Sequence, residues 1–291
     1  MCDNGDLNLA MIKPLAERLV RDGVSGAFVC GTTGESLSLT LDERKAVAEA
    51  WREAAGDRLK VVVHVGHPCQ RDAADLARHA AGIGADAVAA MGPSFFRPAR
   101  VQELVEWCEG VAAAAPEVPF YYYHIPGMTG VGLPMADFLE AAEGRIPNLA
   151  GVKFSNDDLM DFAACLRCGD GRYDLLFGRD ETLLSALVLG AHGAIGSTYN
   201  YMAPVYVEMI RAYQAGDLEA ARAAQAKSVR LVRAFSRYPA LAAQKAIMKW
   251  TGLDCGPVRP PLRNLSEGEL RELRAAIEAL GSVPLETRIV G

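Results

Sequence analysis

The chain has 291 residues, of which 51% are hydrophobic and 23% charged, a balance typical of a globular protein that can bury a large core. The formal net charge is −6 and no run is rich in lysine and arginine, which argues against nucleic acid as a partner. The first ten residues have no signal-peptide pattern and no apolar stretch reaches membrane-spanning length, so we expect a cytoplasmic protein with no membrane partner.

Seven short apolar runs alternate with longer amphipathic stretches along the first two thirds of the chain. Each run is almost continuously hydrophobic, which is typical of strands covered on both faces in a parallel sheet, and the stretches between them are long enough for crossover helices. This alternation predicts an α/β fold of the barrel type. The predicted strands are residues 26–30, 60–65, 86–91, 119–124, 151–154, 174–177 and 193–196.

A closed (β/α)8 TIM barrel has eight strands, and the sequence offers only seven candidates. The remaining strand would precede residues 7–22, because that segment already has the periodicity of the first helix, while residues 1–6 are typical of a loop that follows a strand. We therefore expect a barrel whose first strand is missing from this chain because its start is misassigned. Such a barrel would have two unpaired edges and an exposed core.

Helical periodicity replaces the strand signal after Tyr201. A capping box made by Ser266 and Glu269 marks the start of the last helix. The predicted domains are a catalytic barrel at 1–201 and a C-terminal helical extension at 202–291. The helices expected in the extension are residues 204–215, 218–235, 241–251 and 267–280.

The cysteines and histidines of the chain show no metal-binding pattern. Seven cysteines are scattered along the sequence, and this odd number suits a reducing compartment better than a disulfide framework. Cys165 and Cys168 form one C-x-x-C pair in a helix-like stretch, but no second pair and no histidine lies nearby in the sequence. We therefore expect free thiols, and neither a metal site nor a redox site.

Small and polar residues follow the first predicted strand, at the edge where a barrel carries its chemistry. In the segment 31–35, Gly-Thr-Thr-Gly-Glu, two glycines would expose backbone N–H groups beside the hydroxyls of Thr32 and Thr33. Such a loop can cradle a carboxylate. A tight turn with polar residues explains the same pattern, so the segment alone leaves both interpretations open.

Lys153 lies inside the predicted strand at 151–154, among apolar neighbours. Burial disfavours the charged form of a lysine and lowers its pKa, which yields the neutral amine that attacks a ketone to form an imine. A lysine that extends its ammonium group to solvent at a strand end, or that pairs with a carboxylate, would look the same in the sequence. Both interpretations stay open at this point.

Four segments in order along the chain resemble the signatures of the dihydrodipicolinate synthase and N-acetylneuraminate lyase superfamily. The resemblance covers nearly the whole chain and implies a (β/α)8 barrel with a C-terminal helical extension, assembled as a homotetramer. It also implies a Schiff-base mechanism through Lys153 that needs no cofactor. The four segments are 31–35 (Gly-Thr-Thr-Gly-Glu), 123–126 (Tyr-His-Ile-Pro), 151–155 (Gly-Val-Lys-Phe-Ser) and 193–200 (Gly-Ala-Ile-Gly-Ser-Thr-Tyr-Asn).

Positions that vary within the superfamily favour its sialic acid lyases, in particular the animal type, over its synthases. The synthases commonly carry an arginine where this chain has Met128. Resemblance to the lyases at 177–181 (Phe-Gly-Arg-Asp-Glu) implies that Gly178, Asp180 and Glu181 bind the polyol tail of an open-chain sugar acid. The two carboxylates would otherwise only cap and charge the N-terminus of the helix that follows.

The resemblance implies a class I aldolase, a carbon–carbon lyase, that cleaves N-acetylneuraminate into pyruvate and N-acetyl-D-mannosamine. Lys153 would attack the ketone of the substrate, and Tyr123 would transfer the proton of the C4 hydroxyl, its pKa pulled down by the neighbouring iminium. The substrate would be held by hydroxyl, backbone and carboxylate groups at Thr32, Thr33, Ser155, Gly178, Asp180, Glu181 and Ser197.

Two other functions stay open. One is another pyruvate-dependent aldolase or synthase of the same superfamily, such as a dihydrodipicolinate synthase or a 2-keto-3-deoxy sugar acid aldolase, and the other is a non-catalytic barrel. The chain also departs from the superfamily at a loop where many members have a tyrosine that reaches a neighbouring subunit's proton relay. Phe95 and Phe96 stand there and cannot transfer protons, so we expect the relay to be absent or supplied by Thr33 and the substrate carboxylate.

Overall fold

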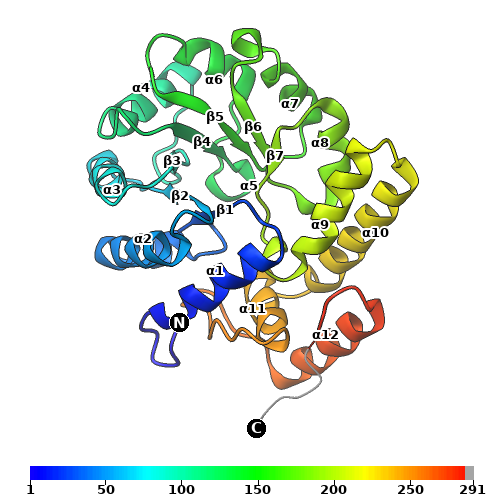
Figure 1. Cartoon of the computed structure of the whole chain (residues 1–291). Helices are drawn as coiled ribbons and strands as arrows, with labels where there is room; N and C mark the ends of the chain where they lie inside the picture. Colours follow the sequence, from blue (N-terminus) through cyan, green and yellow to red (C-terminus); the bar gives the residue numbers. More distant parts are fainter. Residues whose placement is uncertain (286–291) are drawn as a thin grey trace.

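The computed structural model describes residues 1–285 and contains a curled sheet of parallel strands with helices around its outside (Figure 1). Seven strands pair in chain order, from β1 at one edge to β7 at the other, as the alternating sequence pattern predicts. All seven predicted strands are confirmed, with ends that differ by at most two residues. Their bounds are β1 Gly26–Val29, β2 Lys60–His64, β3 Ala87–Ala90, β4 Phe120–His124, β5 Leu149–Phe154, β6 Asp174–Phe177 and β7 Gly193–Ala194.

Helices follow the strands and cover the outer face of the sheet (Figure 1). Short 3-10 helices lie at Leu9–Met11, Ser36–Ser38, Cys168–Gly171 and Asp180–Thr182. The α-helices are α1 Ile12–Arg21, α2 Leu41–Ala55, α3 Gln70–Gly82, α4 Val101–Ala112, α5 Pro126–Thr129, α6 Met135–Ala142, α7 Leu159–Cys165, α8 Leu183–Leu189, α9 Tyr199–Gln214, α10 Leu218–Phe235, α11 Ala240–Trp250 and α12 Glu267–Leu280.

Side chains alternate between the two faces of the curled sheet, and this alternation decides which residues can reach a common site. On the outer face, Val29, Val152 and Phe177 are buried in the hydrophobic core under the helices. On the inner face, the Lys153 nitrogen of β5 lies 3.8 Å from the centre of the Phe28 ring of β1. The curl of the sheet therefore brings together residues whose strands are far apart in the strand order.

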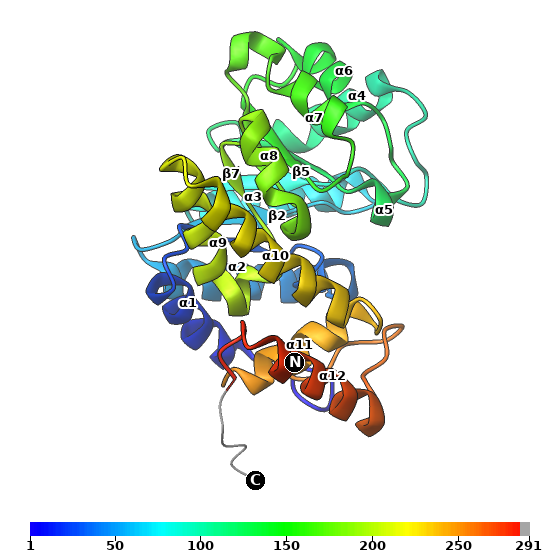
Figure 2. The same ribbon diagram turned by 90° about the vertical axis from the view of Figure 1, so that its right-hand side faces the viewer.

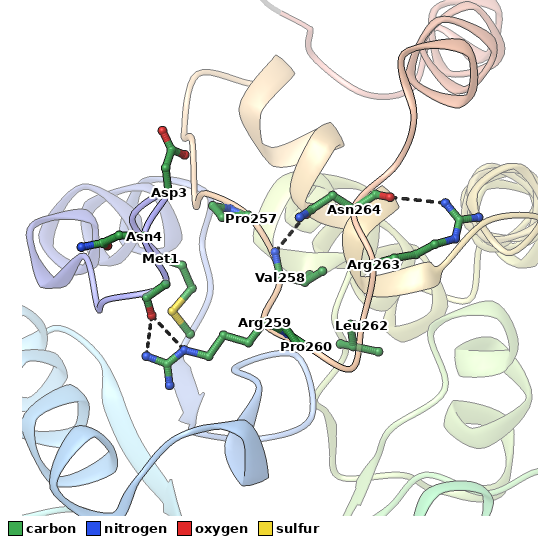
Figure 3. Close-up of a pocket in the computed structure, with 11 residues that line it drawn as sticks. Met1, Asp3, Asn4, Pro257, Val258, Arg259, Pro260, Leu262, Arg263 and Asn264 are labelled. Carbon is green, nitrogen blue, oxygen red and sulfur yellow. Dashed lines mark hydrogen bonds between the residues drawn. The ribbon is translucent and has the colours of Figure 1, made fainter.

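The sheet has two edges within residues 1–285, since β1 and β7 pair with no further strand there. The first residues of the chain lie against the segment between α11 and α12, where Met1 donates from its amino group to the carbonyl oxygen of Cys255 at 2.8 Å. Arg259 donates to the carbonyl oxygen of Gly5 at 2.9 Å, and a cavity of about 310 Å³ lies between the two segments (Figure 3). None of the predicted site residues lines that cavity.

One helix begins earlier than predicted. α9 starts at Tyr199 rather than at residue 204, and it contains Pro204. The proline is tolerated because the backbone of Met202, with φ −138°, interrupts the helix, so Pro204 lies in the first turn after the break, where its missing N–H is not needed. The predicted domain boundary between residues 201 and 202 falls inside this helix, so the division into two domains stays a prediction.

The other helices of the predicted extension lie where the sequence places them. α10 and α12 have the predicted bounds, and α11 is shifted by one residue. Ser266 accepts a hydrogen bond from the backbone N–H of Glu269 at the start of α12, so its capping box is confirmed. Figure 2 shows α11 and α12 at the opposite end of the molecule from α6 and α7. Residues 286–291 of the predicted extension lie outside the described residues.

Candidate active site

Lys153 is buried on the inner face of β5, with 7% of the residue exposed. Its Nζ lies 3.8 Å from the centre of the Phe28 ring and 4.0 Å from the centre of the Tyr123 ring. Burial lowers the pKa of Lys153 to about 7, while the negative charge of Asp180 acts in the opposite direction. Near neutral pH much of this side chain is therefore the neutral, nucleophilic amine, so the geometry favours a nucleophile over a solvent-exposed lysine.

Tyr123 lies beside Lys153, because the two residues are partners in the parallel pairing of β4 with β5. The Tyr123 hydroxyl is 3.2 Å from the hydroxyl oxygen of Thr32, and either group can donate the hydrogen bond. Burial raises the pKa of Tyr123, and hydrogen bonds with Thr32 and Ser155 oppose that rise. The phenol is thus protonated in the free protein, and the lowering of its pKa expected from the sequence has to come from an iminium charge next to it.

The segment after β1 forms a tight turn and also leaves two donors unused. Gly34 donates its backbone N–H to the carbonyl oxygen of Gly31 at 3.0 Å. Glu35 likewise donates its backbone N–H to the carbonyl oxygen of Thr32 at 3.1 Å. Within the described part of the chain, the backbone N–H groups of Thr32 and Thr33 make no hydrogen bond. They can receive a carboxylate, so the turn and the cradle are compatible.

Glu35 ties this turn to the C-terminal helices. Its backbone is in the left-handed region, with φ 57°, and its side chain is buried. The Glu35 carboxylate forms an ion pair with Lys245 of α11 and accepts a hydrogen bond from the backbone N–H of Arg259 at 2.9 Å. Arg259 also donates to the carbonyl oxygen of Ser38 at 2.9 Å. The helical extension thereby fixes the turn that carries Thr32.

Asp180 is buried at the end of β6 and faces the loop after β7. Its Oδ2 accepts hydrogen bonds from the backbone N–H and the hydroxyl of Thr198, at 2.9 and 2.6 Å, so the carboxylate does not cap α8. Burial raises the pKa of Asp180 to about 6, against the effect of Thr198 and of Lys153. Its Oδ1 has no partner among the described residues, and a Cβ atom at Gly196 would lie 1.6 Å from it.

Gly178 and Ser155 contact each other where β6 and β5 end. A Cβ atom added at Gly178 would lie 1.9 Å from the Ser155 hydroxyl oxygen, so the glycine makes room for that hydroxyl. Arg179 forms ion pairs with Asp157 at 3.2 Å and with Glu181 at 2.8 Å. The Glu181 carboxylate predicted to bind a polyol is therefore engaged by Arg179 in the free protein, and a sugar has to share or replace that ion pair.

The hydroxyl groups of Ser197 and Thr33 make no hydrogen bond within residues 1–285. Ser197 uses its carbonyl oxygen to accept a hydrogen bond from the Asn200 side chain at 2.9 Å, while its hydroxyl is unbonded. Thr33 is exposed, and its hydroxyl is likewise unbonded. The structure thus joins Lys153, Tyr123 and Thr32 directly, whereas the roles of Ser197 and Thr33 still depend on the resemblance.

Two residues of the site were missed by the sequence reasoning. Phe28 was only one apolar residue of a predicted strand, and no local signal reveals its contact with Lys153, because that contact depends on how the sheet curls. Thr198 belongs to one of the four resembling segments but was given no role. A hydroxyl directly after Gly-Ser at a strand end is the signal that could have found it.

The loop after β3 contributes no ring contact to the site. Phe95 and Phe96 are 80% and 84% exposed and contact each other edge to face, with ring centres 4.8 Å apart and 86° between their planes. In the described part of the chain, neither ring contacts Tyr123 or Phe28.

Residues 1–285 contain no group of three or more histidine, cysteine, aspartate or glutamate side chains placed to hold a metal ion. No helix in the same range is long and apolar enough to cross a membrane. All seven cysteines are free thiols. In the stretch predicted to be helix-like, Cys165 ends α7 and Cys168 lies in the 3-10 helix that follows.

Comparison with known proteins gives one family and several similar enzymes. The sequence profile of the dihydrodipicolinate synthetase family matches residues 1–280. N-acetylneuraminate lyase of Rattus norvegicus is 41% identical over 285 residues, which cover 96% of this chain and 89% of the relative. N-acetylneuraminate lyase A of Xenopus laevis is 44% identical over 266 residues, which cover 90% and 87%. The solved structure of Proteus mirabilis N-acetylneuraminate lyase has a TM-score of 0.94 at 40% identity and covers 97% of this chain and 95% of its own.

Proposed function

Since this chain belongs to the dihydrodipicolinate synthetase family, we propose that it is a class I aldolase that cleaves N-acetylneuraminate into pyruvate and N-acetyl-D-mannosamine. The observation that carries this proposal is the buried amine of Lys153, whose pKa is lowered to about 7 and which lies against Phe28 and Tyr123. The N-acetylneuraminate lyases to which the chain is similar over most of its length support the substrate.

The first step is the formation of an imine. The open-chain substrate binds with its carboxylate on the unused N–H groups of Thr32 and Thr33. Lys153 attacks the C2 ketone through its neutral amine, and the resulting carbinolamine loses water to give an iminium. The burial of Lys153 serves this step, because it keeps a nucleophilic amine available near neutral pH.

Carbon–carbon cleavage follows. The bond between C3 and C4 breaks, and its electron pair moves to the iminium, which becomes a neutral enamine. The C4 hydroxyl loses its proton as the aldehyde forms, and Tyr123 is the group in our proposal that takes this proton while passing its own to Thr32. The enamine is then protonated at C3, and water releases pyruvate from Lys153.

This relay lies within one chain. Phe95 and Phe96 cannot transfer protons, and Thr33 has no side-chain hydrogen bond in the described residues. Thr32 is hydrogen-bonded to the Tyr123 hydroxyl, so we assign to Thr32 the role that the sequence suggested for Thr33. The carboxylate of the substrate, bound next to it, is the further acceptor for the proton.

The polyol tail of the substrate is proposed to lie along the ends of β5, β6 and β7. Ser155 and Gly178 provide a hydroxyl and the space beside it, and Asp180 provides an oxygen that is unbonded in the described residues. Glu181 reaches the tail once it shares the ion pair with Arg179. Ser197, on the loop after β7, is assigned to the same tail by resemblance.

The iminium itself accepts the electrons of the broken bond, so the proposed reaction needs no metal or organic cofactor. We further propose that the protein is a homotetramer, as the resemblance implies. A cytoplasmic location is part of the same proposal, and seven free cysteines are in accord with a reducing compartment.

Product analysis with a panel of substrates tests this function. The protein is given N-acetylneuraminate, a shorter 2-keto-3-deoxy sugar acid, or pyruvate together with aspartate semialdehyde, and the products are identified by mass spectrometry. We expect pyruvate and N-acetyl-D-mannosamine from N-acetylneuraminate at the highest kcat/KM of the panel. Lys153→Ala should abolish the reaction, and Lys13→Ala, which removes an exposed lysine of α1, should leave it unchanged.

Other outcomes of the same panel reassign the protein. A higher kcat/KM on the shorter acid or in the condensation reaction would move it to another branch of the family. No turnover of any substrate by the wild type would indicate a non-catalytic barrel.

A further inference from the structure

The inner face of the sheet carries an aromatic residue that the proposed reaction does not use. Phe28 of β1 presents its ring to the reacting nitrogen of Lys153, with 3.8 Å between Nζ and the ring centre. We propose that Phe28 is a catalytic residue of this site, whose ring stabilises the positive charge on that nitrogen in the ammonium and iminium states. The inference rests on the proposed Schiff-base reaction and adds Phe28 to the residues that act in its imine-forming step.

Two aromatic rings meet at the Lys153 nitrogen. The centre of the Tyr123 ring is 4.0 Å from Nζ, and the centres of the Phe28 and Tyr123 rings are 5.3 Å apart with 72° between their planes. Both rings lie well within the range of about 6 Å in which an aromatic face attracts a cation. Among the described residues, Nζ has no hydrogen bond and no ion pair. The two rings therefore take the place of the carboxylate that commonly pairs with a buried lysine.

The Phe28 ring is held in this position by its neighbours. A Cβ atom at Gly31 would lie 2.8 Å from the ring, so the turn after β1 passes directly over Phe28. His64 packs against Phe28 and against Tyr123, with ring centres 6.0 and 5.7 Å apart. Burial lowers the pKa of His64 far below its usual value, so this neighbour brings no charge to Lys153 at neutral pH.

The weakness of the attraction suits the reaction. A carboxylate in contact with Lys153 would raise the pKa of the amine strongly and keep it protonated near neutral pH. An aromatic ring attracts the cation much less, so burial still sets a lowered pKa and the amine can lose its proton. Phe28 also has no lone pair that could accept a proton or react with the iminium. It can therefore favour a cation on this nitrogen without blocking the nucleophile.

Phe28 acts on one step in particular. When the carbinolamine loses water, the C–O bond breaks, the nitrogen lone pair becomes the second bond of C=N, and the hydroxyl takes up a proton from the solvent and leaves as water. The nitrogen becomes positive in this step, so the ring stabilises the product more than the carbinolamine. Cleavage then converts the iminium into a neutral enamine, so the ring favours imine formation and not cleavage itself.

Stepwise fluorination of the Phe28 ring tests the inference. Mono-, di- and trifluorophenylalanine at position 28 weaken the negative charge on the ring face while they nearly preserve its shape. The pKa of Lys153 is followed by NMR on protein with carbon-13 at the lysine Cε, and Lys153→Ala identifies its signal. We expect the pKa to fall with each fluorine, by a total equivalent to a two- to roughly thirty-fold change in the protonation constant.

A matched control is available on the strand of Lys153 itself. Phe154 points to the outer face and packs against the rings of His124 and Phe162, at 5.0 and 5.3 Å. The same fluorinated residues at position 154 should leave the pKa of Lys153 unchanged. If fluorination at 28 also leaves that pKa unchanged, the Phe28 ring only fills space and the inference is wrong. A rise in the pKa would show that water had entered the site, and would contradict it as well.

A second measurement connects the ring to the reaction. The fraction of protein trapped as the pyruvate adduct by borohydride, at a fixed low pyruvate concentration, should fall in step with fluorination at Phe28 and not at Phe154. The two proposals fail in different ways. No adduct on the wild-type protein contradicts the proposed function, while an adduct that does not respond to fluorination contradicts only the role of Phe28. The NMR titration decides that role in either case, because it needs no substrate.

Discussion

The proposed active site has two halves that are held in different ways. Strand register and ring contacts fix one half, and hydrogen bonds and ion pairs between loops fix the other. We call the first the lysine half, made of Phe28, Tyr123 and Lys153. We call the second the tail half, made of Ser155, Gly178, Arg179, Asp180, Glu181 and Thr198.

Because the two halves are held differently, we expect them to have different roles in the reaction. In the lysine half, burial decides the chemistry, because it lowers the pKa of Lys153 and raises the pKa of Tyr123. In the tail half, some polar groups are already paired with one another, as Arg179 is with Glu181, and a substrate has to exchange with those partners. Changes in the lysine half should therefore alter the chemical step, and changes in the tail half should alter folding or substrate affinity.

The largest effect is expected for Tyr123→Phe. This change removes the hydroxyl that transfers the proton from C4 and keeps the ring beside Lys153, so kcat should fall by about 10²- to 10⁴-fold while the pyruvate adduct still forms. Steady-state kinetics and borohydride trapping measure the two quantities. Tyr121→Phe is the control, because Tyr121 lies on the same strand and donates its hydroxyl to Asp174 at 2.9 Å instead. An unchanged kcat in Tyr123→Phe would place the proton transfer elsewhere.

The next effect concerns folding in the tail half. Gly178→Ala should lower the free energy of unfolding by about 1–3 kcal/mol, because the new Cβ atom would lie 1.9 Å from the Ser155 hydroxyl oxygen. Denaturant titration measures the loss. Gly82→Ala in α3, where a Cβ atom would meet nothing within 4 Å, should show no such loss. Equal stability of the two variants would mean that Ser155 and Gly178 are not packed as described.

A smaller effect is expected where the two halves meet. Asp180→Asn removes the negative charge that raises the pKa of Lys153, so that pKa should fall below its value of about 7, by up to one unit or about tenfold in the protonation constant. The reactive form of Lys153 is the neutral amine, so kcat/KM rises as the pH increases through this pKa. In Asp180→Asn that rise of kcat/KM should occur at lower pH, even if the maximal kcat/KM reached above this pKa also changes. A rise that stays in place would show that Asp180 does not act on Lys153.

The smallest effect is expected for Arg179→Ala. Its ion pair with Glu181 is partly exposed, and such pairs contribute about 0.2–1 kcal/mol. The change frees the Glu181 carboxylate for the substrate, so KM for N-acetylneuraminate should fall by less than about fivefold, with kcat unchanged. A rise in KM would instead mean that Arg179 itself binds the substrate.

The sequence predicted the strand order and the lysine half better than the tail half. Apolar runs identified all seven strands, because burial on both faces leaves a local pattern in each strand. Lys153 could be found because a charged side chain inside such a run is unusual, whereas Tyr123 was assigned only through the resemblance. The same reasoning missed Phe28, since a phenylalanine in a strand is ordinary and only the three-dimensional curl brings it to Lys153.

In the tail half, the residue types were found but not their pairing. The sequence suggested that Asp180 and Glu181 bind a polyol, whereas Asp180 bonds to Thr198 and Glu181 to Arg179 in the free protein. Such pairings depend on how loops from separate strands approach each other, which no periodicity records. The early start of α9 was missed for a related reason. A proline inside a helical pattern usually interrupts the helix, but Pro204 is tolerated because it follows the break at Met202.

The central claim is that Lys153 forms an imine with the substrate, and borohydride trapping tests it most directly. The protein is incubated with pyruvate, reduced with borohydride and digested, and the peptide that contains Lys153 is analysed by mass spectrometry. The account predicts one reduced pyruvate adduct, located on Lys153 and absent from the Lys153→Ala variant. No adduct, or an adduct on another lysine such as Lys245, would contradict it.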